Sequence, residues 1–260
     1  EVMGRELAAE LRAEGHTDLR SVPEARLPDA RRRRAWRAVQ QGSPVIEAEL
    51  GQQLRALPRP RALLRIDTIG YATPIWVGTQ PYQVLPCQWT AEIEDPDTGR
   101  WQTHAFLADG LSDPRRRFAE TLLSALGPRG AVIAYNAGFE RNRLRELAAL
   151  FADLAPELDA LQTRIVDLFQ LARAHVYHPA MRGSWSFASV TRAFAPDLPE
   201  DGLSPQAAFA LCISPKQSEA RRQTLRAQLL AHGQHEVTAL MRLLVSFEAP
   251  GPTLNGADDA

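Results

Sequence analysis

The chain has 260 residues, of which 45% are hydrophobic, and a formal net charge of −1 at pH 7. This length accommodates one α/β domain with a sizeable core and leaves room for a smaller appendage. The near-zero charge gives no general electrostatic attraction to nucleic acid, so any such binding would have to come from a local patch. The two cysteines, Cys87 and Cys212, lack metal-ligand spacing, and we expect buried free thiols. No apolar run reaches the roughly 18 residues of a membrane helix, so we expect a cytoplasmic protein without membrane contact.

The N-terminal part of the chain is predicted to be helical. Apolar residues recur at helical spacing, most clearly within residues 31–39, and several prolines interrupt the pattern. Pro58 and Pro60 then mark a boundary, because proline fixes φ and lacks the amide donor of a continuing helix. The predicted organisation is a helical N-terminal extension at 1–57, an α/β domain at 58–248 and a disordered polar tail at 249–260.

The α/β domain is predicted to begin with a three-stranded meander. An apolar run opens it, and the turn 95–99 joins the next two strands as a hairpin. Further helices and a short strand follow, and we expect Asp167 to cap the helix that it precedes. The predicted strands are 62–69, 82–93, 101–107 and 131–135, and the predicted helices are 114–126, 139–151, 168–175 and 218–247. This order predicts a mixed sheet flanked by helices.

Two charged side chains are predicted to share one face of the first strand. Side chains alternate between the faces of a strand, so Leu64 and Ile66 lie on one face, whereas Arg65 and Asp67 lie on the other. The strand therefore presents an apolar face and a face that carries opposite charges.

Three segments carry further charged or polar groups in a recognisable pattern: the first strand with Arg65 and Asp67, the run 135–140, and the helical run 232–236. Together they resemble the motifs of the DEDD-type 3'-to-5' exonucleases, the superfamily of polymerase proofreading domains. The resemblance implies a ribonuclease-H-like fold and a pair of divalent cations held by four carboxylates. By motif position, Asp67 replaces the first-strand Glu of that family, Glu140 the Asp of the second motif, and Glu236 the Asp of the last helix.

The remaining ligand position of the family is occupied by Arg65. In a second register, Asp67 matches the first Asp and Ile69 the Glu, and one ligand is lost in either case. A guanidinium carries five donors and no acceptor, so it cannot ligate a cation but can pair with the acids that would hold one. We therefore expect the Arg65 guanidinium within about 4 Å of a carboxylate of Asp67, Glu140 or Glu236. This predicts that no metal cofactor is bound, whereas an active site would use Mg²⁺ or Mn²⁺ held by those three acids.

His232 lies four residues before Glu236 and hence on the same helical face. The family carries a Tyr at that spacing or a His one residue further away, acting on the water nucleophile. Histidine at the tyrosine spacing matches neither subtype. We retain His232 as a candidate member of the degenerate catalytic site, and the alternative is a partly exposed helix histidine.

Two further runs, one around residues 81–89 and one around 177–186, resemble a branch of the superfamily without an assigned function. Their aromatic side chains could stack on a nucleic-acid base or cover the core. Asn136 is expected to orient the loop before Glu140, because Asn tolerates turn geometry. The candidate substrate-binding residues are Tyr82, Gln83, Trp89, Asn136, His178 and Trp185.

The sequence thus predicts an exonuclease-like pseudoenzyme whose two-metal site is degenerate. Its candidate ligands are single-stranded nucleic acid, a partner protein, or an upstream part of the natural protein, since the chain begins with Glu1 rather than Met. A metal-dependent 3'-to-5' exonuclease with weak or altered activity is the first alternative. A purely structural or dimerisation module is the second, because fold alone does not determine function.

Overall fold

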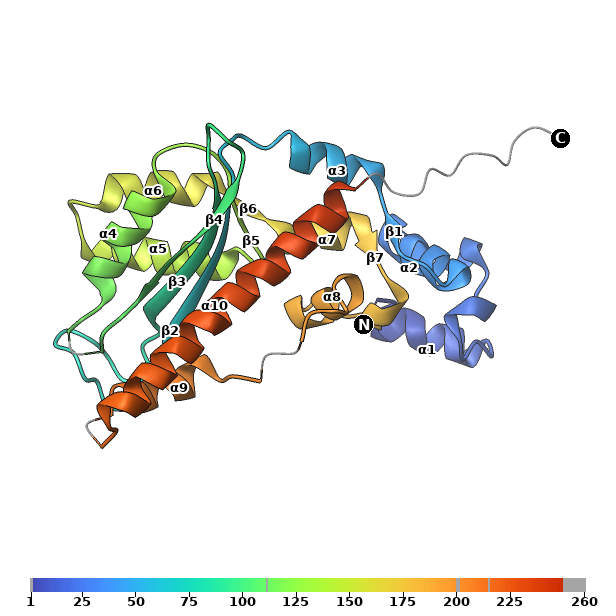
Figure 1. Ribbon diagram of the computed structural model, residues 1–260. Helices are drawn as coiled ribbons and strands as arrows, with labels where there is room; N and C mark the ends of the chain where they lie inside the picture. Colours follow the sequence, from blue (N-terminus) through green and yellow to red (C-terminus); the bar gives the residue numbers. More distant parts are fainter. Residues whose placement is uncertain (1, 111, 200–201, 215, 250–260) are drawn as a thin grey trace. The chain divides into compact units, whose positions relative to one another are not determined.

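The computed structural model describes residues 2–110, 112–199, 202–214 and 216–249 (Figure 1). The chain divides into two compact units. We call Leu57–Leu168 with Pro199–Met241 the sheet unit, and Glu1–Ala56 with Phe169–Leu198 and Arg242–Ala260 the small unit. The predicted main domain, 58–248, is therefore divided between both units. Apart from Ala249, the predicted disordered tail lies outside the described residues.

The small unit is largely helical, as predicted for the N-terminal stretch. Its first segment also contributes a short strand, β1 (Val45–Ile46), which pairs antiparallel with β7 (Val176–Tyr177). The N-terminal stretch therefore shares a two-stranded sheet with a segment far along the chain. The other elements are α1 (Arg5–Ala13), η1 (Leu19–Ser21), η2 (Glu24–Arg26), α2 (Ala30–Gln41), α3 (Ala48–Arg55), most of α7 (Leu168–His175), η3 (Pro179–Met181) and α8 (Phe187–Phe194).

The sheet unit contains a five-stranded mixed sheet in the order β4-β3-β2-β5-β6. The central strand β2 pairs antiparallel with β3 and parallel with β5, so the sheet changes direction at β2. The strands are β2 (Ala62–Ile69), β3 (Leu85–Glu94), β4 (Trp101–Leu107), β5 (Val132–Ala134) and β6 (Ile165–Asp167). The helices are α4 (Arg115–Leu126), α5 (Gly138–Leu150), α6 (Ala155–Arg164), α9 (Pro205–Cys212) and the part of α10 (Glu219–Glu248) up to Met241.

One face of the sheet packs against α4, α5 and α6 (Figure 1). Leu64 and Ile66 of β2 point to this side and join one apolar cluster with Phe118 of α4 and Leu144 of α5. Phe118 and Leu144 are fully buried. The face that the sequence assigned to Leu64 and Ile66 is therefore the apolar face of the sheet.

The opposite face packs against α9 and α10. Ile69 of β2 and Leu85 of β3 form a second apolar cluster with Phe209 of α9 and Leu229 of α10. Beyond this cluster the face becomes polar, because β2 next presents Asp67 and Arg65 to this side. Arg65 and Asp67 therefore lie on the same face of β2, as predicted.

Two further predictions concern the cysteines and membrane-spanning helices. Cys87 and Cys212 are both buried and unbridged, which confirms the expectation of free thiols. Among the described residues, no helix combines the length and the apolar composition needed to cross a membrane.

Candidate functional site

The candidate site lies where the polar face of β2 meets α10, within the sheet unit. Arg65 and Asp67 are separated by one residue on β2 and stand opposite Thr90 and Gln88 of β3. The register of β2 and β3 shifts between Asp67 and Thr68, and such irregularities re-aim side chains at the ends of strands. Arg65 and Asp67 thus occupy the last regularly paired part of the central strand.

Gly233 allows α10 to approach this part of the sheet closely. A Cβ atom added at Gly233 would lie 2.2 Å from Thr90 Oγ1 and 2.5 Å from Gln88 Nε2. The same contact is held by a hydrogen bond, in which Gln88 Nε2 donates to the Leu229 carbonyl at 2.8 Å. The absence of a side chain at residue 233 therefore positions its neighbour His232, and Glu236 one turn later, over β2.

Arg65 forms a close ion pair with Glu236. The Arg65 Nε donates to Glu236 Oε2 at 2.7 Å, and Nη2 lies 2.5 Å from the same oxygen. Both side chains are about one-fifth exposed, at 21% and 19%. The prediction that the Arg65 guanidinium lies within 4 Å of one of the three acids is confirmed.

The electrostatic surroundings keep Arg65 charged. Burial alone lowers the pKa of the guanidinium, but the charges of Glu236, Glu140 and Asp67 and the hydrogen bond to Glu236 outweigh burial. The net result is a pKa of Arg65 above its ordinary value. The site therefore contains a permanent internal cation that faces several carboxyl groups.

Asp67, His232 and Glu236 form a compact group of potential ligands. One ligand atom from each lies within 4.8 Å of the other two, and the Asp67 Oδ1 to His232 Nε2 distance is 4.0 Å. Burial raises the pKa of the Asp67 carboxyl, and the charge of Glu236 adds to the increase, whereas His232 and Arg65 oppose it. Two carboxylates and an imidazole could hold one divalent cation, but Arg65 already contacts the Glu236 oxygen at ligand distance.

His232 is buried, although one of the two sequence interpretations made it a partly exposed helix histidine. Only 8% of its surface is exposed, so the alternative of a partly exposed helix histidine is wrong. The close contact of Gly233 with β3 explains the burial, because it brings the adjacent residue down onto the sheet. His235, by contrast, is only half-buried.

Glu140 is buried near the start of α5, and its Oε2 has no hydrogen-bond partner among the described residues. Burial raises the pKa of this carboxyl to about 7, with smaller increases from Asp167 and Glu236, whereas Arg65 and a backbone hydrogen bond lower it. The site therefore includes an acid that changes protonation near neutral pH. Glu140 is not part of the compact ligand group of Asp67, His232 and Glu236.

Asp167 is a member of the carboxyl cluster that the sequence interpretation overlooked. It ends β6, next to β5 in the sheet, and its charge acts on Glu140. Its Oδ1 accepts a hydrogen bond from the backbone N–H of Asn136 at 3.1 Å. Asn136 adopts a left-handed φ of 65°, which agrees with a turn-forming role before Glu140. The position of Asp167 at the end of a short apolar run could have indicated this, because the carboxyl ends of adjacent parallel strands meet at one edge of a sheet.

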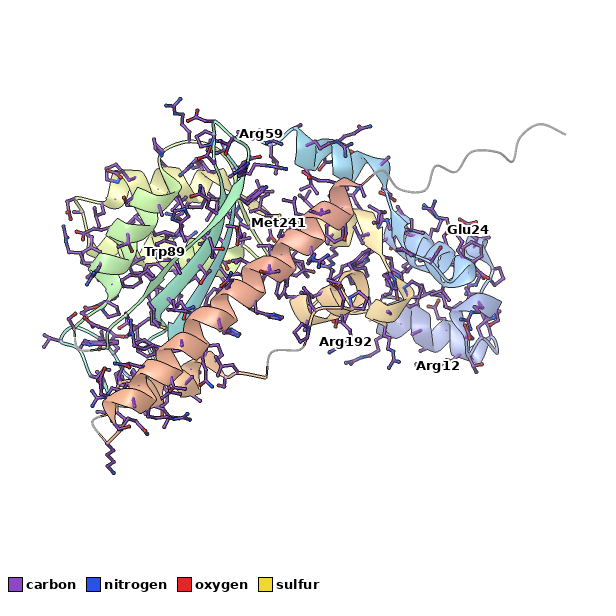
Figure 2. All side chains as sticks on the ribbon, in the orientation of Figure 1. Arg12, Glu24, Arg59, Trp89, Arg192 and Met241 are labelled. Carbon is purple, nitrogen blue, oxygen red and sulfur yellow. The ribbon has the colours of Figure 1, made fainter. Side chains whose placement is uncertain are left out.

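Trp89 is a core residue. It is 3% exposed, belongs to the apolar cluster beneath α4, and its indole N–H donates to Thr121 Oγ1 at 3.1 Å (Figure 2). The prediction is wrong because Trp89 lies on the apolar face of β3. Tyr82, in contrast, is 76% exposed with φ of 57°, and the Gln83 side chain accepts a hydrogen bond from the Gln80 amide.

His178 and Trp185 belong to the small unit, whereas the carboxyl cluster belongs to the sheet unit. Trp185 is 8% exposed, and its indole donates to the Val176 carbonyl at 3.2 Å while its ring contacts Tyr177. Trp185 therefore covers the core of its own unit, which contradicts its assignment to substrate binding. His178 is half-buried, its Nδ1 accepts from the Ala180 amide at 3.0 Å, and burial lowers its pKa.

The model of one protein family, described as a domain of unknown function (DUF2779), matches residues 63–186. The matched segment runs from β2 to the residue that precedes α8, and it contains Arg65, Asp67 and Glu140. His232 and Glu236 lie outside it. No curated protein and no solved structure matches the chain.

Proposed function

We propose that the sheet unit is an exonuclease-like domain in which an internal cation replaces the metal pair, and that it acts as a binding module for single-stranded nucleic acid. The observation that carries the proposal is the Arg65–Glu236 ion pair, with Nη2 to Oε2 at 2.5 Å. The guanidinium stands at a ligand position of the DEDD motif. It neutralises the acids that would otherwise repel one another without a bound ion.

The sheet topology supports the relation to ribonuclease-H-like proteins. Three consecutive antiparallel strands, β2 to β4, are extended on the other side of β2 by the parallel strands β5 and β6. This arrangement fits the mixed sheet expected of that fold, and the motif residues of β2, α5 and α10 belong to the same unit. The topology is independent of the motif match, so the two observations strengthen each other.

Exposed aromatic side chains of the sheet unit support binding to unpaired bases. Tyr82 is 76% and Phe139 38% exposed, and the Arg143 guanidinium lies 5.5 Å from the Phe139 ring centroid. Exposed rings near a cation provide stacking surfaces that tolerate any base. Phe139 directly precedes Glu140, so its ring adjoins the carboxyl cluster along the chain.

The proposal is tested with end-labelled single-stranded DNA and RNA. We expect no degradation that depends on Mg²⁺ or Mn²⁺, because a site that lacks one ligand and contains a fixed cation disfavours a second cation. Fluorescence anisotropy should detect binding of the same oligonucleotides that persists in a chelating agent. A Tyr82→Ala variant should bind more weakly, whereas Tyr177→Phe, a change in the small unit, serves as the control. Metal-dependent cleavage that disappears in Asp67→Ala would contradict the proposal.

A weakly active metal-dependent exonuclease is the second candidate, favoured by one specific observation. The ligand atoms of Asp67, His232 and Glu236 lie within 4.8 Å of one another, which would suit a single divalent cation. Such an enzyme requires Arg65 to leave Glu236 when the ion binds. The cleavage assay distinguishes the two candidates directly.

A further inference from the structure

A separate cavity lies in the small unit, at the segment whose sequence resembles the branch motif around residues 177–186. Its volume is about 420 Å³. The lining residues are Ala180, Met181, Arg182, Ser184, Ser189 and Arg192. This set contains two arginines and two serines but no acidic side chain. The charged groups of the lining therefore favour an anion over a cation, and its apolar part can contact the remainder of a larger ligand.

The two arginines reach the cavity from different elements. Arg182 and Ser184 come from the loop after η3, whereas Ser189 and Arg192 come from α8. Figure 2 labels Arg192. Ser189 and Arg192 are three residues apart and hence share one face of the helix. A ligand in the cavity can therefore be contacted from two directions.

Serine hydroxyls form a connected series along this segment. The Ser184 Oγ lies 3.2 Å from the Ser186 Oγ, which lies 2.8 Å from the Ser189 Oγ. Ser186 also begins α8 by accepting from the Ser189 amide at 3.2 Å. These contacts hold the hydroxyls of Ser184 and Ser189 in fixed positions at the cavity. Arginine forks match the oxygens of a phosphate group, and the Ser189 hydroxyl, which accepts from Ser186, retains its own O–H as a further donor.

The backbone at Arg182 favours glycine. Its φ is 49°, in the left-handed region, where a side chain other than glycine, asparagine or aspartate is uncommon. An arginine at such a position is expected where its side chain has a use, because the conformation costs free energy. The same conformation also supplies a clean experimental variant, since Arg182→Gly removes the guanidinium without opposing the backbone.

We infer that this cavity is a binding site for a phosphate group, either the free anion or the phosphate of a small phosphomonoester. Its volume falls in the range of roughly 300–1,000 Å³ that is typical of small-molecule sites, which leaves room for more than the phosphate. The inference rests only on residues of the small unit. It stands or falls independently of the function proposed for the sheet unit.

Isothermal titration calorimetry on the full chain at pH 7.5 tests this site, with inorganic phosphate and ribose 5-phosphate as probes. We expect saturable binding of at least one probe to the wild type. Arg182→Gly and Arg192→Gln should each weaken it at least about tenfold, because each removes a charge-assisted contact. Arg173→Ala, which removes an exposed arginine from α7 of the same unit, should leave binding unchanged. Thermal melts without ligand should show that Arg182→Gly remains folded.

The two probes separate the sources of the phosphate group. Tighter binding of ribose 5-phosphate identifies an ester as the ligand, and equal binding identifies the free anion, and either result supports the phosphate site. The inference is overturned if neither probe binds saturably, or if both the Arg182→Gly and Arg192→Gln variants bind as tightly as the wild type.

Discussion

The two faces of the β2–β3 ribbon differ in what their side chains do. On the face beneath α4, α5 and α6, Leu64, Ile66 and Trp89 pack against other buried apolar groups. On the face beneath α10, Arg65 and Asp67 face Glu236 and a buried histidine. Because side chains alternate, a single strand supplies both environments. We expect the apolar face to supply most of the stability, whereas the polar face holds the charged groups of the candidate site.

The largest expected effect comes from the apolar face. Phe118→Ala removes a fully buried ring from the cluster beneath α4, and we expect the free energy of unfolding to fall by about 3–5 kcal/mol. Chemical denaturation followed by circular dichroism measures the change. The matched control is Phe139→Ala, since Phe139 is 38% exposed on α5, and its cost should be below about 1 kcal/mol. Equal costs would show that the apolar face is not the main source of stability.

The second prediction concerns the pH dependence of the polar site. Burial raises the pKa of Glu140 from 4.5 to about 7, so the folded state binds this proton more tightly than the unfolded state. The contribution of Glu140 to the free energy of unfolding is therefore fully present below pH 4.5 and is lost as the pH rises to about 7. The loss should amount to about 3 kcal/mol, at roughly 1.4 kcal/mol per pKa unit.

Denaturation of the wild type and Glu140→Gln across pH 4.5–7 measures this contribution. The free energy of unfolding should fall less steeply in the variant, because the amide does not titrate. Glu146→Gln, at a half-exposed position of the same helix, should retain the slope of the wild type. Identical slopes for Glu140→Gln and the wild type would contradict the raised pKa.

The third prediction is a smaller change in stability at the ion pair. Arg65→Met keeps much of the side-chain volume but leaves Glu236 without its cation, and we expect a loss of about 1–3 kcal/mol. The double variant Arg65→Met/Glu236→Gln should recover part of that loss, because the uncompensated carboxylate is removed as well. Arg145→Ala, an exposed change on α5, is the control. Strict additivity of the two single changes would show that the pair is not coupled.

The sequence predicted the framework of the sheet unit well. Two strands were predicted at 62–69 and 101–107, and the structure has β2 and β4 at the same bounds. Alternation along β2 was sufficient to place Arg65 and Asp67 on one face, because that periodicity is a property of the strand itself. The ion pair was predicted from the family resemblance, which places Arg65 among the motif acids, together with the complementarity of their charges.

The sequence predicted less where contacts between distant segments determine the structure. Helices α6, α8 and α9 were not predicted, since each has only eight to ten residues, whereas α7, of eight residues, was predicted with the aid of the cap expected at Asp167. The burial of His232 depends on the contact of Gly233 with Thr90, which no local pattern reveals. Trp89 was misassigned because an aromatic side chain suits both a core and a stacking surface.

The most direct test of the account is calorimetric titration of Mn²⁺ into the wild type and into Arg65→Asp. The account predicts no saturable Mn²⁺ binding by the wild type, because the guanidinium occupies the Glu236 oxygen and repels a second cation. Arg65→Asp restores a carboxylate at the family's ligand position, so saturable Mn²⁺ binding and a raised melting temperature in Mn²⁺ are expected. Saturable binding by the wild type that Asp67→Ala abolishes would contradict the replacement of the metal by Arg65.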